Sequence, residues 1–114
     1  MNPRNFPSLG SLNERVELQN KVQTIDGLGG HVQTFVPLAF VWSRVVSANG
    51  SITEIADARA ARISHIITIR FRSDISSGDR VIYRSVALEV ISASDFNGRK
   101  AYLVLKCSQI QVTG

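Results

Sequence analysis

The fold class is decided by residues 16–45, "VELQNKVQTIDGLGGHVQTFVPLAFVWSRV", where two strand-like runs flank a glycine-rich centre. The first run alternates between polar side chains and the apolar Val16, Leu18 and Val22. Asn20 interrupts its apolar side. This period of two is typical of a half-buried strand. In the second run, residues 39–46 are apolar on both faces, and Pro37 before them marks an edge or a break. The stretch therefore predicts two strands joined as a β-hairpin.

The centre of this stretch, "TIDGLGG" at residues 24–30, holds three glycines within four positions. A phosphate-binding loop requires a helix after the glycines, so that helix N–H groups point at the anion. Here a strand-like run follows, and no Gly-Lys-Ser/Thr is present. We therefore interpret the glycines as a hairpin tip that tolerates positive φ. At this length it exceeds a tight two-residue turn.

Residues 47–63, "SANGSITEIADARAARI", form the one helical candidate. Ser51 and Glu54 have the spacing of a capping box, and apolar residues follow at helical spacing. The apolar stripe is thin and rich in alanine, and Arg59 lies within it. Such a helix is expected to need a neighbour, for example another subunit.

From residue 64 onward the period of two returns. Further strands are predicted in "HIITIRFR" (65–72), "RVIY" (80–83), "VALEVISA" (86–93) and "KAYLVLKCS" (100–108). About six strands joined by polar turns predict a mainly β fold: a small antiparallel β-barrel or sandwich, with one short helix or loop between the second and third strands. The expected organisation is a flexible N-terminal arm at 1–13 and a single barrel domain at 14–114, with excursions at 24–36 and 47–63.

Composition limits the class of protein. The 114 residues carry 13 Lys+Arg against 9 Asp+Glu, a net charge of +4, which permits contact with polyanions without requiring it. The single cysteine, Cys107, cannot form an intrachain disulfide and is expected to be a small buried residue. No stretch approaches the length of a membrane span, and the first residues lack the apolar core of a signal peptide. We expect an intracellular protein with no membrane partner.

Signs of catalysis are sparse. One cysteine and two histidines match no zinc spacing, the aspartates fall in predicted turns, and no serine lies in a Gly-x-Ser-x-Gly elbow. We therefore expect no enzyme activity, no metal and no cofactor.

The basic residues leave an alternative open. Arg70 and Arg72 project from one side of their predicted strand and are possible polyanion contacts. A small basic barrel of the OB type could bind single-stranded nucleic acid with such a face if aromatic rings lay beside it. Phe71 is expected to point inward, and Phe40 and Trp42 lie in an apolar run. This leaves as exposed candidates only Tyr83, Phe96 and Tyr102, which form no obvious platform.

The ordered set of segments carries a resemblance to a known family. The segments are "RVELQ" (15–19), "DGLGG" (26–30), Phe35, "VWSRV" (41–45), "SHIITIRFR" (64–72), "RVIY" (80–83), "LEVISA" (88–93) and "RKAYLVLKC" (99–107). From about residue 9 to 108 the chain resembles the head–tail connector proteins of tailed bacteriophages and prophages, which are called head–tail adaptor, joining, head closure or stopper proteins. One departure is phenylalanine at position 35, where such proteins often carry tryptophan.

The resemblance implies a structural virion protein and not an enzyme. Family members look like small β-barrels that form a homo-oligomeric ring, a hexamer or dodecamer, beneath the portal. They bridge the portal or an adaptor ring to the tail (terminator) protein, and some close the DNA channel. The same fold occurs in gene transfer agents. The expected location is thus the head–tail interface of a virion or virus-like particle, after synthesis in the bacterial host cytoplasm.

The resemblance also assigns residues. The expected ring-interaction loop comprises Asp26, Gly27, Leu28, Gly29, Gly30 and Phe35, on an arm that docks on a portal or tail protein; the alternative is a turn with no partner. The segment that enters the channel in stopper-like members corresponds to residues 48–62, with Ile52, Glu54, Ile55, Arg59 and Arg62 as the expected channel-facing side chains. These would make transient contact with packaged double-stranded DNA. For this interpretation to hold, the two excursions, residues 24–36 and 47–63, must not pack tightly onto their own barrel.

Overall fold

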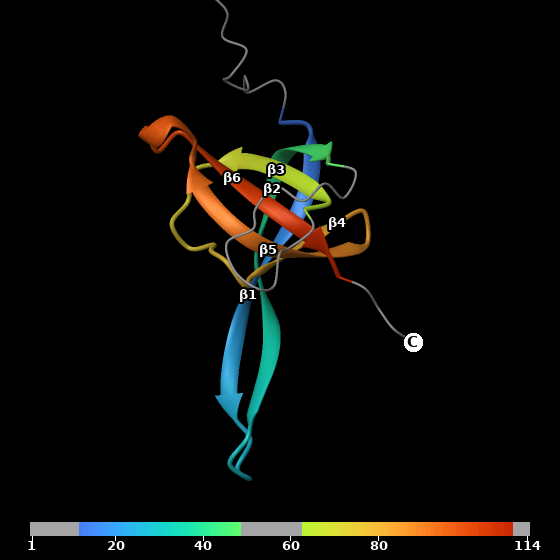
Figure 1. Ribbon diagram of the computed structural model, residues 1–114, viewed down its shortest axis with the longest axis vertical. Coiled ribbons are helices and arrows are strands. Elements are labelled where there is room, and N and C mark those ends of the chain that lie inside the picture. Colours follow the sequence, from blue (N-terminus) through green and yellow to red (C-terminus); the bar gives the residue numbers. More distant parts are fainter. Residues whose placement is uncertain (1–11, 49–62, 111–114) are drawn as a thin grey trace, which may run out of the picture.

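The computed structural model describes residues 12–48 and 63–110 of the chain. Six strands, paired antiparallel throughout, close into one barrel in the order β1-β2-β3-β6-β5-β4 (Figure 1). The elements are β1 (Glu14–Ile25), β2 (His31–Ser47), β3 (His65–Arg70), β4 (Arg80–Tyr83), β5 (Val86–Asp95), the 3-10 turn η3 (Phe96–Gly98) and β6 (Tyr102–Gln109). The predicted mainly β fold of about six strands is confirmed, and of the two expected architectures the chain adopts the barrel.

Closure depends on the first half of β1. Residues 14–19 pair with β2 on one side, and Glu17–Gln19 pair with β4 on the other. Each barrel strand thereby has two neighbours, and no strand forms an open edge of the sheet. Beyond Gln19, β1 pairs with β2 alone.

The core lies inside the barrel and follows the alternation of the sequence. Its buried side chains are Val16, Leu18, Ile67, Ile69, Ile75, Val81, Leu88, Val90, Leu103, Leu105 and Cys107. Each fully buried aliphatic side chain contributes about 1.5–3 kcal/mol relative to exposure. Cys107 is the small buried residue that the sequence predicts, and burial raises the pKa of its thiol to about 12.

Below the barrel, β1 and β2 continue as a two-stranded ribbon, here called the arm (residues 20–36; blue to teal in Figure 1). The sequence predicts an excursion over residues 24–36, but the strands stay paired as far as Ile25 and His31, which leaves only residues 26–30 as a loop. The arm lengthens the molecule to 59 Å, against 29 and 27 Å in the other directions.

Pro37 lies where the arm meets the barrel. The register shifts between Leu18 and Gln19: Leu18 is opposite Ala39, and Gln19 is opposite Pro37, so that Leu38 is the extra residue of a bulge. A proline lacks the N–H that a regular ladder needs, and a bulge accommodates it. Pro37 therefore marks an irregularity within one long strand, whereas the sequence suggested an edge or a break before a strand at 39–46.

The predicted helix at residues 47–63, with its channel-facing residues Ile52, Glu54, Ile55, Arg59 and Arg62, lies almost wholly outside the described residues. Its two flanks lie side by side. The Ala48 N–H donates to the Ser64 carbonyl at 2.9 Å, and Ile63 is fully buried. The excursion therefore leaves and re-enters the barrel at one place, between β2 and β3. Within the described ranges, no helix has the length and apolarity needed to cross a membrane.

Candidate functional site: the arm and the opposite end of the barrel

The arm ends in a fixed turn. The Asp26 N–H donates to the Gly30 carbonyl at 3.0 Å, and Asp26 Oδ1 accepts from the N–H groups of Leu28 (2.8 Å) and Gly30 (3.0 Å). Gly27 and Gly29 adopt φ of +83° and +89°, values that strain other residues. The interpretation of the glycine-rich stretch as a hairpin tip with positive φ is confirmed at these two positions. The turn holds Leu28 in a defined place.

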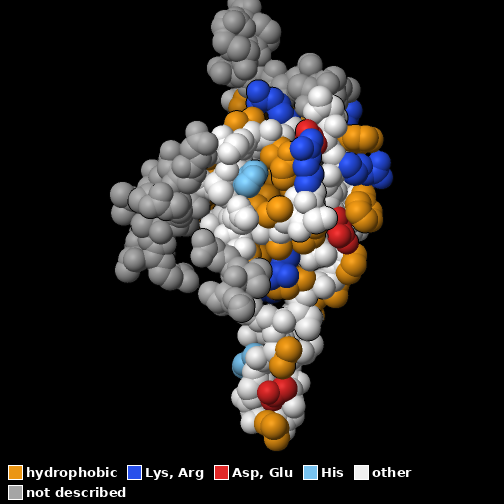
Figure 2. Space-filling model, turned by 90° about the vertical axis from the view of Figure 1, so that its right-hand side faces the viewer, with side chains coloured by type: hydrophobic (Ala, Val, Ile, Leu, Met, Phe, Trp, Pro, Cys, Tyr) orange, Lys and Arg blue, Asp and Glu red, His pale blue; other side chains and the backbone are white. Residues whose placement is uncertain are grey.

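The tip is strongly apolar and open to solvent. Leu28 is 93% exposed and Ile25 74%, and Val32 and Val36 are also largely exposed on the strands behind them. A hydrophobic side chain forms the extreme end of the arm, and an acidic one lies just above it (Figure 2). Between residues 22 and 36, Asp26 is the one acidic residue and the sequence contains no Lys or Arg. Large apolar side chains gathered on a protruding element mark an interaction surface.

A buried carboxylate fixes the root of the arm. Asp79, 8% exposed, accepts from the Lys21 N–H (2.8 Å) and the Ser76 N–H (2.9 Å), and its Oδ2 also accepts from Asn20 Nδ2 at 3.2 Å. The Asn20 amide donates in addition to the carbonyl of Asp74 at 2.9 Å. Asn20, which interrupts the apolar alternation of β1, thus ties the first residues of the arm to the loop after β3.

Phe35 lies at the root and not at the tip. Its ring is half-buried beneath the Arg80 guanidinium, whose central carbon is 3.7 Å from the ring centroid. Arg80 Nε is buried without a hydrogen-bond partner in the described part of the chain. The two residues line a hollow of about 290 Å³, together with Lys21, Gln33, Gly78, Asp79, Glu89 and Ile110. The structure therefore separates Phe35 from the Asp26–Gly30 turn with which the sequence analysis grouped it.

Arg70 and Arg72 do not form a matched basic pair. Arg70 ends β3 and is exposed, whereas Arg72 lies beyond the strand and donates to both carboxylate oxygens of Asp74, at 2.7 and 3.0 Å. These hydrogen bonds raise the pKa of Arg72 and lower that of Asp74. Because Asp74 offsets the charge of Arg72, Arg70 is the cation of the two that stays available to a polyanion.

The exposed aromatic residues are not those that the sequence predicts. Phe40 and Trp42 are 62% and 53% exposed on the outer face of β2, because Val41 and Ser43 take the inward positions. Arg15 lies over both rings, 6.0 and 5.1 Å from their centroids. The residues predicted as exposed candidates are half-buried; they are Tyr83, Phe96 and Tyr102. The run is apolar on both faces, so it conceals which parity is outward; the signal in the sequence is Arg44, which is exposed on the same face as Phe40 and Trp42.

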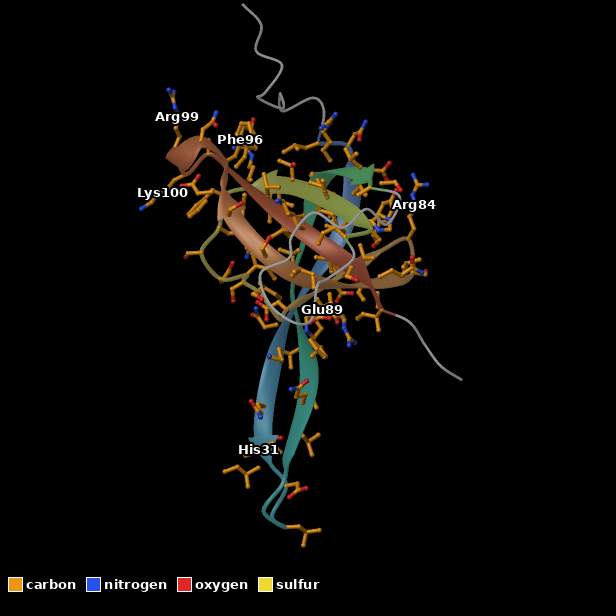
Figure 3. The ribbon with its side chains drawn as sticks, in the orientation of Figure 1. His31, Arg84, Glu89, Phe96, Arg99 and Lys100 are labelled. Atoms are coloured by element: carbon orange, nitrogen blue, oxygen red, sulfur yellow. The ribbon has the colours of Figure 1, made fainter. Side chains whose placement is uncertain are left out.

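Beside Trp42 the barrel surface is hollowed, in what is here called the upper hollow. It measures about 270 Å³ and is lined by Leu12, Val41, Trp42, Arg70, Phe71 and Arg72. Leu12, which lines it, directly precedes β1, and β1 begins at the end of the barrel away from the arm (Figure 1). Phe71 packs partly against the core, as the sequence predicts. The β5–β6 turn, with Arg99 and Lys100, lies toward this end too, whereas His31 lies near the tip of the arm (Figure 3).

No group of three or more His, Cys, Asp or Glu side chains that could hold a metal ion occurs within residues 12–48 and 63–110. The described residues instead offer contact surfaces: the apolar tip of the arm, and an aromatic and cationic face at the opposite end of the barrel. Hydrogen bonds fix the root of the arm between them.

Known proteins share this fold, and one protein family matches the sequence. Residues 7–110 match the family model described as phage head completion protein. In fold, the chain is similar to protein SF1141 from Shigella flexneri 2a, whose solution structure gives a TM-score of 0.67 at 23% identity, over 90% of this chain and 96% of that one. It is also similar to a chain of the native gene transfer agent virion, with a TM-score of 0.65 at 18% identity, over 92% and 98% of the two chains. No curated protein matches the sequence. Since the family model spans nearly the whole chain, this protein belongs to the phage head completion protein family and is a structural protein of the head.

Proposed function

We propose that the protein forms a homo-oligomeric ring that joins the capsid portal, or an adaptor ring beneath it, to the tail. The observation that carries the proposal is the arm: a paired ribbon that leaves a closed barrel and presents Leu28 and Ile25 to solvent. The family supplies the setting, a phage-type head. A gene transfer agent is an equally suitable setting, because a chain of such a particle shares the fold.

The described surfaces suit a ring subunit. Copies in a ring contact one another head to tail, so each must present two dissimilar faces. The arm offers an apolar tip at one end, and the barrel offers Arg15, Phe40 and Trp42 at the other. The Asp79 hydrogen bonds hold the arm at a set angle to the barrel, which favours one geometry of contact over many.

A second part of the proposal concerns the channel. The excursion between β2 and β3 leaves the barrel at one place, where Ala48 and Ser64 are hydrogen-bonded. We propose that residues 48–62 enter the axial channel, with Arg59 and Arg62 toward DNA phosphates, and that they help to retain the packaged DNA. Ring size, a hexamer or a dodecamer, and these contacts remain predictions from the family resemblance.

The experiment that tests the joining function is a substitution at the tip. Leu28→Asp places a charge on the most exposed apolar side chain, so the barrel should keep its circular dichroism and melting temperature while DNA-filled heads fail to join tails. Gln23→Asp adds the same charge at an exposed polar position of the arm and should leave joining normal. Normal yields of joined, infectious particles from Leu28→Asp would refute the role of the tip.

One observation favours a second candidate, a barrel that binds single-stranded nucleic acid. Arg15, Phe40 and Trp42 form an exposed cation–aromatic cluster on which bases could stack. This function requires tight binding of oligonucleotides by the isolated chain, a steep loss of affinity with rising salt, and loss of binding in Trp42→Ala. A connector should bind free oligonucleotides weakly, so a titration at two salt concentrations separates the candidates.

A further inference from the structure

We propose that the tip of the arm of one copy docks in the upper hollow of the next copy, so that a single contact, repeated around the ring, covers both surfaces. The inference rests on the proposed ring function and names the partner of the tip: a second copy of this chain. It assigns Leu28 and Ile25 to the inserted side, and Val41, Phe71 and Arg70 to the receiving side.

The tip cannot occupy the hollow of its own chain. The two strands of the arm are hydrogen-bonded as far as Ile25 and His31, and Asp79 fixes the root of the arm to the barrel. The tip and the upper hollow lie toward opposite ends of a molecule 59 Å long (Figure 1). Among the described residues, the tip therefore leaves its own hollow open, and both surfaces are free to contact a second copy.

The two surfaces are chemically complementary. The upper hollow has apolar walls from Leu12, Val41 and Phe71, and the tip carries Leu28 at 93% exposure. The charges are opposite as well. Arg70 is exposed at the hollow and forms no ion pair within the described residues, and Asp26 is the one carboxylate of the arm beyond its root.

Asp26 keeps an oxygen for such a contact. Its Oδ1 accepts both of the hydrogen bonds that its side chain makes in the turn, from Leu28 and Gly30. Its Oδ2 accepts no hydrogen bond from the described residues. An arginine of another copy could therefore pair with Oδ2 while the turn stays intact, which makes Arg70 the natural partner.

A contact between two different patches of the same chain is heterologous. Such contacts generate a ring when the rotation between copies closes and an open filament when it does not. A surface of another virion protein that combines apolar and acidic side chains would also fit the upper hollow. The tip of a second copy is preferred because this chain itself carries that combination, on an element that projects far enough to reach a neighbour.

The test is chemical cross-linking between cysteines placed beside the contact and not within it. Thr24→Cys lies on the arm next to Ile25, and Ser73→Cys directly follows Arg72 of the upper hollow; both positions are exposed. The control pair keeps Thr24→Cys and replaces Ser73→Cys with Ser77→Cys. Ser77 is an exposed serine of the same loop, next to Gly78, which lines the hollow at the root of the arm together with Lys21. Native Cys107 is fully buried and adds no reactive thiol.

The full-length variants are assembled on portal-containing heads and treated with a short bismaleimide. We expect a ladder of covalently linked copies from Thr24→Cys/Ser73→Cys and none from Thr24→Cys/Ser77→Cys. Adding Leu28→Asp or Arg70→Glu to the first pair should reduce the ladder at least about tenfold, because each removes one side of the contact. This result would support the inference.

The other outcomes separate the two proposals. Links from the thiol introduced by Thr24→Cys to a different virion protein, with no links between copies, would overturn this inference and leave the joining function standing. Equal ladders from both cysteine pairs would overturn it as well, since the tip would then have no specific receptor. No links at all, together with normal head–tail joining by Leu28→Asp, would overturn both proposals.

Discussion

Asp79 holds the arm to the barrel, and its replacement by alanine should cost more stability than any exposed charge of the molecule. The carboxylate accepts three hydrogen bonds: from the Lys21 and Ser76 N–H groups at 2.8 and 2.9 Å, and from Asn20 Nδ2 at 3.2 Å. Its partners belong to β1 and to the loop after β3, two parts of the chain that are more than fifty residues apart. Asp79→Ala therefore removes hydrogen bonds that connect β1 to the loop after β3, and not merely those of a local turn.

The magnitude follows from those contacts. A hydrogen bond to a charged acceptor contributes about 1.5–3 kcal/mol, and donors left buried add a penalty. The three bonds share one acceptor, so they do not add fully, and Lys21 is exposed enough for water to replace part of the loss. We expect a loss of about 3 kcal/mol in the free energy of unfolding, a large fraction of the 5–15 kcal/mol typical of a domain. For a chain of this size the melting temperature should fall by roughly 10–15 °C.

Urea unfolding measures the loss, and amide hydrogen exchange shows where it arises. In Asp79→Ala the amides of Lys21 and Ser76 should lose protection, while those of β3 and β6 keep theirs relative to the lowered global stability. The turn at the tip should be unaffected, because Asp26 stabilises it independently of the root.

Asp74→Ala is the matched control within the same loop. The Asp74 side chain is 46% exposed, and within the described residues its ion pair is with Arg72, so its loss should cost less than about 1 kcal/mol. The Asp74 carbonyl, which accepts from Asn20, is retained in alanine. Equal and small losses in the two variants would show that the carboxylate of Asp79 does not anchor the arm.

Two further predictions concern titratable groups of the barrel. Burial lowers the pKa of His65 from 6.5, so the unfolded chain takes up this proton more readily than the folded one. Stability should therefore fall as the pH drops through about 6.5 and level off below the folded pKa, and an NMR titration midpoint for His65 at or above 6.5 would contradict this. The Cys107 thiol, with a pKa raised to about 12, should not react with a disulfide reagent at about pH 8 until urea unfolds the chain. Rapid labelling of the native protein would show that the thiol is not buried.

The strands could be predicted because a barrel wall imposes a simple pattern. Each wall residue points either into the core or out to solvent, so Leu103, Leu105 and Cys107 alternate with their neighbours in β6 as the sequence indicates. The same alternation places Ala101 on the inward face, but this residue lies exposed just before the strand. Alternation thus predicts reliably which face a strand residue occupies, but it predicts less reliably where the strand ends.

Features that depend on distant pairing could not be predicted. Asn20 looks like a defect in β1 until Asp79, 59 residues later, accepts its amide hydrogen bond. The exposed positions of Phe40 and Trp42 follow from the register of β2 against β1, and in a run that is apolar on both faces only Arg44, exposed on the same face, points to them. Phe40 and Trp42, which we propose as part of a contact face, are among these cases, because contacts beyond the barrel need not obey its alternation.

The arm explains why a closed barrel is a suitable platform for assembly. Closure gives every barrel strand a partner on each side along part of its length, so little edge is left there for strand-to-strand association. Beyond Gln19 the strands β1 and β2 have only each other, so the arm again presents two free edges, with Ile25 and Val32 exposed on them. On a monomer such an element is a site for aggregation, because nothing covers its apolar side chains. A chain that confines these exposed apolar side chains to one hydrogen-bonded ribbon restricts association to one place and one direction, as the ring proposed above requires.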